Sequence, residues 1–201
     1  MAAEPTWRSP AVIRRDDSAK RRARLRLWQI EAAPDRPRQA YLFAIVDAAR
    51  DRRIYPGLKR FSARHEILPL YQGPTATDLA AVGPYLVCLG RTDELFDWLW
   101  DNGWGDNWGV FMWSLVSTEN LRSHFRRHTM VRTSDGERLV FRFYDPRVML
   151  PFLPTCDAAQ LREFFGPVQQ FMLEADGGAA LVTLRRQPQG LVSQTLRLDE
   201  V

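Results

Sequence analysis

Tyr41-Leu42-Phe43-Ala44-Ile45-Val46 is an unbroken apolar run that ends on Asp47. The run is short and rich in β-forming residues, so it predicts a strand that is buried on both faces of a sheet. Two later runs, 84–89 and 108–116, have the same character. After further turn residues, closing strands are expected at 168–173, 180–184 and 191–198.

Helices are predicted between these strands from their capping residues. Thr92, Ser117 and Asp157 each precede apolar residues at helical spacing, and Gln160 completes a capping box with Asp157. Asp145 is followed directly by proline, a pairing that is typical of a helix start. The sequence therefore predicts several short helices with well-defined first residues.

A tight turn and an irregular order of elements set the fold class. Asp135-Gly136 predicts a β-hairpin whose strands cover 130–132 and 138–144. Residues 48–55 are expected to be helical. Strands and helices do not alternate in regular βαβ units. We therefore predict an α/β fold of the mixed α+β kind: a single compact domain with a mixed sheet, short capped helices and a β-hairpin.

Basic charge is concentrated in the first 39 residues. The chain has 28 Lys and Arg against 24 Asp and Glu, and residues 1–39 hold ten of the basic and five of the acidic ones. Prolines at 34 and 37 predict a linker, so we divide the chain into a basic leader and linker, 1–39, and a compact domain, 40–201. The leader up to Arg24 is expected to add charge but almost no apolar surface to the core. Nucleic-acid binding through this leader is one alternative function.

The apolar runs are far shorter than the roughly 18 residues that a bilayer span requires. The N-terminus carries charged residues and prolines before any apolar run, unlike a secretory signal. We therefore expect no membrane contact and a cytoplasmic location. Cys88 and Cys156 match no metal or redox spacing and are expected to be buried free thiols.

One histidine pair and several missing motifs bear on catalysis. His124 and His128 have the spacing of two zinc ligands on one helix face, but the sequence offers no third ligand. The expectation is a half-buried histidine pair without a metal. The sequence has no nucleophile elbow and no phosphate-binding glycine loop. We therefore assign no catalytic residue and no cofactor, and keep a small-molecule enzyme as a second alternative.

Tryptophans are concentrated in one part of the chain. Five of the seven fall within sixteen positions: Trp98, Trp100, Trp104, Trp108 and Trp113. One face of a helix cannot bury all of them, because Trp98 points away from the apolar stripe of its helix. Exposed tryptophan near arginine is typical of a protein-interaction surface. The alternative is that these side chains belong to the core.

Four motifs carry a resemblance to a known family. They are Gly83-Pro84-Tyr85-Leu86-Val87, then Gly103-Trp104-Gly105 with Trp108-Gly109, then Leu121-Arg122 with His124-Phe125-Arg126-Arg127, and Phe141-Arg142-Phe143-Tyr144-Asp145-Pro146-Arg147-Val148 with Phe152-Leu153-Pro154. In this order, from about Tyr41 to about Glu174, the chain resembles the effector adaptor domain of type VI secretion systems (Tap/Tec-like).

The resemblance implies a cytoplasmic adaptor or chaperone without enzymatic activity. Such a protein binds a toxin effector and loads it onto the trimeric spike protein, which is VgrG-like. From the resemblance and the tryptophan cluster we predict six partner-binding residues: Trp98, Trp104, Trp108, Arg122, Arg142 and Arg147.

Overall fold

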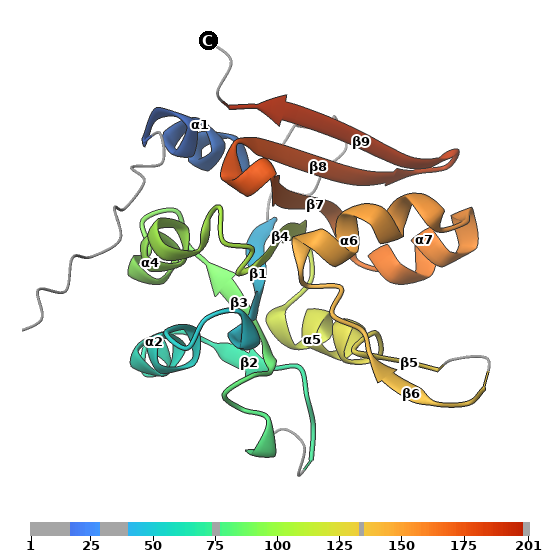
Figure 1. Ribbon diagram of the computed structural model, residues 1–201, viewed down its shortest axis with the longest axis horizontal. Helices are drawn as coiled ribbons and strands as arrows, with labels where there is room; N and C mark the ends of the chain where they lie inside the picture. The colour runs from blue at the N-terminus through green and yellow to red at the C-terminus, as the bar shows by residue number, and fades with distance from the viewer. Residues whose placement is uncertain (1–16, 29–39, 74–76, 133–134, 199–201) are drawn as a thin grey trace, which may run out of the picture.

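A seven-stranded sheet lies between two layers of helices (Figure 1). The computed structural model describes residues 17–28, 40–73, 77–132 and 135–198. Across the sheet the strands are β2 (Ile67–Pro69), β3 (Pro84–Leu89), β1 (Tyr41–Asp47), β4 (Gly109–Ser114), β7 (Val168–Ala175), β8 (Ala180–Gln187) and β9 (Gly190–Arg197).

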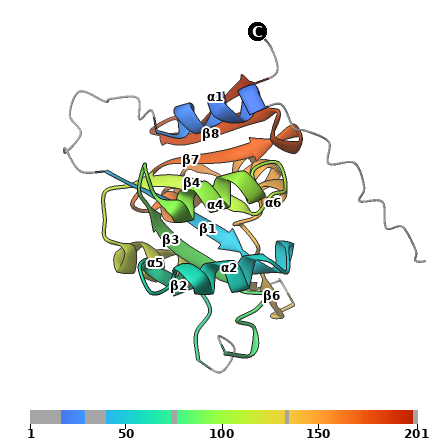
Figure 2. The same cartoon turned by 90° about the vertical axis from the view of Figure 1, so that its left-hand side faces the viewer.

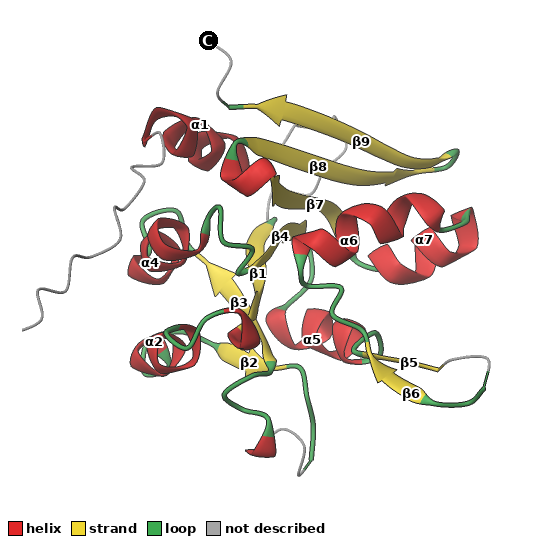
Figure 3. Cartoon of the chain, viewed as in Figure 1, coloured by secondary structure: helices red, strands yellow, loops and turns green. Residues whose placement is uncertain are grey.

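Helices cover both faces of this sheet, and a separate hairpin stands beside it (Figure 3). The α-helices are α1 (Asp17–Leu27), α2 (Ile54–Phe61), α4 (Glu94–Gly103), α5 (Thr118–Arg126), α6 (Pro146–Phe152) and α7 (Ala158–Phe165). Three short 3-10 helices are η1 (Ala48–Arg50), η2 (Leu153–Thr155) and η3 (Asp176–Gly178). The hairpin consists of β5 (Met130–Arg132) and β6 (Arg138–Val140).

Strand β1 lies inside the sheet, between β3 and β4, and contributes to a core on each side. Leu42, Ala44 and Val46 belong to the core beneath α1, α2 and α4, whereas Phe43 and Ile45 belong to the core beneath α5, α6 and α7. Figure 2 shows the first three helices in front of the sheet. The alternation follows from the two-residue repeat of a strand. The predicted burial of this strand on both faces is confirmed.

The mixed α+β class is confirmed, but the sheet is not mixed. Every described strand pair is antiparallel. Short turns join β7, β8 and β9, and consecutive strands joined by short turns must run in opposite directions. Strand β1 also runs antiparallel to both of its neighbours, β3 and β4.

Most predicted helix starts are confirmed. The side chains of Ser117, Asp145 and Asp157 accept hydrogen bonds from the first turn of α5, α6 and α7, and Asp157 forms the predicted capping box. Helix α4 begins one residue later than expected, since Asp93 rather than Thr92 accepts the bond from the Leu95 N–H.

Two predicted boundaries are wrong. Residues 48–55 do not form one helix: the chain forms η1, turns at 51–53 and then begins α2. The second hairpin strand ends at Val140 rather than Tyr144. Beyond it the chain turns, and the Asp145 N–H donates to the Arg142 carbonyl at 3.0 Å. This turn directs Phe143 and Tyr144 into the core instead of along a strand.

Helix α1, in the described part of the leader, packs on the core of the domain. Ala23 and Leu27 of α1 are fully buried against the sheet and α4. The indole N–H of Trp113 donates to the Leu27 carbonyl at 3.0 Å, and Arg24 forms an ion pair with Asp97 of α4. Of the described residues up to Arg24, Ala23 is the one buried apolar side chain; Leu27, the larger contribution of α1, lies beyond the segment to which that expectation applies. The two apolar residues lie four apart in a basic segment, a pattern too short to indicate a buried face.

Leu27→Ala is expected to lower the free energy of unfolding by about 3 kcal/mol, because it removes a fully buried leucine. Leu25, on the exposed side of the same helix, is the matched control, and Leu25→Ala should change stability by less than about 0.5 kcal/mol. Urea unfolding of the full chain measures both values. Equal, small effects would mean that α1 does not pack on the domain.

Candidate protein-binding groove

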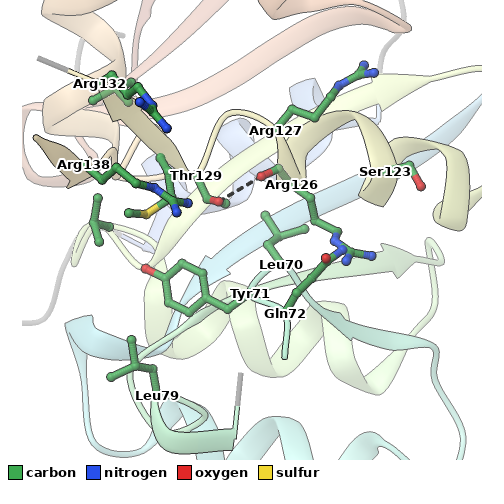
Figure 4. Close-up of a pocket in the computed structure, with 13 residues that line it drawn as sticks. Leu70, Tyr71, Gln72, Leu79, Ser123, Arg126, Arg127, Thr129, Arg132 and Arg138 are labelled. Carbon is green, nitrogen blue, oxygen red and sulfur yellow. Dashed lines mark hydrogen bonds between the residues drawn. The ribbon is translucent and has the colours of Figure 1, made fainter. Parts of the chain in front are cut away.

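An open groove of about 910 Å³ lies beside the hairpin (Figure 4). Helix α5, the β5–β6 hairpin and the segments around residues 71 and 79 form its walls. The lining residues are Leu70, Tyr71, Gln72, Leu79, Ser123, Arg126, Arg127, Thr129, Met130, Val131, Arg132, Arg138 and Val140.

The lining is strongly basic. Among the described residues it contains four arginines, Arg126, Arg127, Arg132 and Arg138, and no carboxylate. Within the part of the chain that the structure describes, none of the four forms an ion pair with a carboxylate. Arg132 and Arg138 extend from the hairpin toward the centre of the groove, whereas Arg127 extends away from them (Figure 4). The groove therefore carries positive charge that the described residues do not neutralise.

A buried polar cluster adjoins the groove at Tyr71. Arg142 donates to the carboxylate of Asp47, which is fully buried at the end of β1. Burial raises the pKa of Asp47 above its ordinary value, and the bonds from Arg142 oppose this rise. Tyr144 lies next to this pair, and its hydroxyl is 3.2 Å from that of Tyr71. Tyr71 lines the groove, so the cluster and the groove share a wall.

A second carboxylate in the same motif has a structural role. Asp145 caps α6 and accepts hydrogen bonds from the backbone and the guanidinium of Arg147. Burial raises the pKa of Asp145, but the bonds and charge of Arg147 outweigh this effect and hold it below its ordinary value. The motif therefore fixes the start of α6.

The predicted exposure of the tryptophan cluster is wrong. Trp104 and Trp108 are each only 4 % exposed, and Trp98 is half-buried. Helix α2 covers the side of α4 that was expected to face solvent: the Trp98 ring centre is 5.7 Å from that of Phe61. Trp104 stacks on Trp100 with ring centres 4.4 Å apart. The alternative, that the tryptophans belong to the core, is confirmed for Trp100, Trp104, Trp108 and Trp113, and Trp98 packs against this core.

The three predicted partner-binding arginines lie near the groove but do not line it. Arg122 donates to the Pro69 carbonyl at 3.0 Å and contacts Glu119, and Arg142 and Arg147 hold the buried carboxylates. Their partner contacts stay predictions. Sequence reasoning missed Arg132 and Arg138. Their placement on either side of the Asp-Gly turn was the available signal.

His124 lies in the last turn of α5 and is buried, whereas His128 follows the helix and is half-buried. The Nε2 of His124 lies 2.8 Å from the Phe164 carbonyl, and the two imidazole centres are 4.9 Å apart. Burial lowers the pKa of both groups; for His128, burial together with the charges of His124 and Arg127 lowers it to about 4. In the described ranges no group of three or more His, Cys, Asp or Glu could hold a metal ion.

Stability should therefore fall as the pH decreases. A folded pKa of about 4 for His128, against about 6.5 when unfolded, means that its contribution is complete above pH 6.5 and is lost toward pH 4. At pH 5 this group should cost about 2 kcal/mol relative to pH 7. His128→Leu should show a correspondingly smaller loss between these pH values in urea unfolding. Identical pH dependence of variant and wild type would contradict the assignment.

Fold and groove together define a three-layer α+β domain with a basic surface groove. The chain belongs to the family described as "Domain of unknown function (DUF4123)", which it matches over residues 42–163. This segment contains every residue that lines the groove. No curated protein and no solved structure matches the chain. None of the described helices is long and apolar enough to cross a membrane.

Proposed function

We propose that the protein is a non-enzymatic, cytoplasmic adaptor of a type VI secretion system. In this role it binds a toxin effector and loads it onto the VgrG-like spike protein. The proposal rests on the four sequence motifs that resemble the adaptor domain, all of which lie within or next to the matched segment.

The observation that carries the proposal is the position of the longest motif, 141–148. The Phe141 N–H donates to the Thr129 carbonyl at 2.9 Å, and the hydroxyl of Tyr144 contacts that of Tyr71. Thr129 and Tyr71 both line the groove. The motif thus supports an open, charged surface, which is what an adaptor requires to hold another protein.

Deleting the gene is expected to block delivery of one toxin and to leave the other secretion activity intact. A plasmid copy of the wild-type gene should restore delivery. An adaptor serves its own cargo, so the defect should be specific to that toxin. Unimpaired delivery of every toxin, or loss of all secretion, would contradict the proposal.

A further inference from the structure

Two arginines face each other across the hairpin. Arg132 and Arg138 are directly paired in the register of β5 and β6, so their side chains project from the same face of the hairpin. Like charges in directly opposite positions destabilise a strand pair. Neither guanidinium is paired with a carboxylate of the described chain. Asp135 and Glu137, the carboxylates of the turn, are not among the residues that line the groove. The arrangement therefore favours an anionic group between the two arginines.

Apolar side chains accompany this charge. Met130 and Val140 form the next pair on the same face of the hairpin and also line the groove. Val131 and Val140 are 42 % and 48 % exposed, although large apolar side chains are usually buried. On the opposite wall Leu79 adds apolar surface. A ligand that fits this groove combines negative charge with apolar side chains.

A third observation concerns α5. The Nε of Arg126 is buried and has no hydrogen-bond partner among the described residues. The Arg126 carbonyl accepts from the Thr129 hydroxyl at 2.9 Å, which fixes the chain between α5 and the hairpin. Buried donors in native proteins are usually satisfied.

We infer that the groove binds an acidic, apolar peptide segment of a partner protein, with a carboxylate held between Arg132 and Arg138. Charge complementarity selects the carboxylate, and bidentate bonds from arginine give it orientation. The inference rests on the proposed function in that the segment belongs to the toxin or the spike.

A protein segment fits better than a nucleic acid. Proteins that hold single strands stack successive bases on aromatic side chains. Of the described residues that line the groove, Tyr71 is the one aromatic, and its hydroxyl contacts Tyr144. The exposed valines instead suit aliphatic side chains.

The test uses the full chain and a short fluorescein-labelled peptide that alternates glutamate with valine and leucine, followed by fluorescence anisotropy. A second peptide has glutamine at every glutamate position, and a labelled oligothymidylate tests for nucleic acid. Wild type should bind the glutamate peptide at least about tenfold more tightly than the glutamine peptide. The double variant Arg132→Glu/Arg138→Glu should weaken this binding at least about tenfold.

Arg186→Glu is the matched control. Arg186 is an exposed strand arginine of β8 outside the groove, and its variant should change binding by less than about twofold. Arg138→Glu alone places a carboxylate opposite Arg132, so it should lose binding while the thermal midpoint stays at or above that of wild type. Binding loss without loss of folding distinguishes a binding role from a structural one.

Three results would overturn the inference: equal affinity for both peptides, equal losses in the double variant and the control, or tighter binding of the oligothymidylate that the double variant abolishes. Binding of purified toxin and spike separates this inference from the proposed function. If the double variant binds both as well as wild type does, the groove inference fails and the proposed function stands. If wild type binds the glutamate peptide as expected but neither protein, the proposed function fails.

Discussion

Trp100→Ala should lower the free energy of unfolding by about 3–5 kcal/mol, the usual cost of truncating a buried aromatic side chain. Trp100 is 2 % exposed and lies at the centre of the core beneath α1, α2 and α4. It stacks on Trp104 and Phe96, with ring centres 4.4 and 5.9 Å away. Alanine would leave a cavity bounded by these rings, which are held by their own contacts. Guanidinium unfolding followed by circular dichroism measures the loss.

Tyr41→Ala is the control for this prediction, because Tyr41 is an aromatic residue with 38 % exposure at the start of β1. Its loss should cost less than about 1 kcal/mol. If Trp100→Ala were equally mild, the tryptophan cluster would not be a structural core. If Trp100→Ala has the expected effect, reduced partner binding by variants in this cluster reflects lost folding and does not identify a contact surface.

Arg142→Ala should be nearly as damaging, with a loss of about 3–5 kcal/mol. The substitution leaves the carboxylate of Asp47 fully buried, with the Ala49 N–H as its remaining described donor. An unpaired buried charge is costly, because desolvation is no longer offset by the guanidinium. Adding Asp47→Asn to Arg142→Ala should recover part of the loss, since a neutral amide requires no counter-charge.

Arg147→Ala provides the matched control, because it removes a similar pair from the same motif. The Arg147 side chain is 55 % exposed, and Asp145 keeps its hydrogen bond from the backbone N–H of residue 147 after the change. The expected loss is about 1 kcal/mol or less. Both carboxylates are buried, but the charge of Arg50 also favours the ionised form of Asp145. Equal losses for the two arginine variants, in urea unfolding at pH 7, would contradict the view that Asp47 depends more strongly on its arginine.

The sequence predicts features that depend on near neighbours. The burial of β1 follows from one apolar run, and the starts of α5, α6 and α7 follow from a cap residue and the few residues after it. Such features require no knowledge of distant parts of the chain.

Burial of the tryptophans could not be predicted in this way. It depends on α2, about forty residues earlier, which covers Trp98. The position of α1 depends in the same way on its contact with Trp113. The groove lies between segments from three parts of the chain, so its arginines are brought together only by the fold. The pairing of Arg132 with Arg138 could be predicted from the sequence, because an Asp-Gly turn between two short strands indicates their register.

The most direct test of the proposed function is a binding measurement with purified proteins. The folded wild-type chain is mixed with the toxin and the spike protein of the proposed function, separately and together, and analysed by calorimetry and size-exclusion chromatography. A standard-sized interface should be populated at micromolar concentrations, so the account predicts a complex with each protein or with both together. Failure of folded wild-type protein to bind either of them under these conditions would contradict the account.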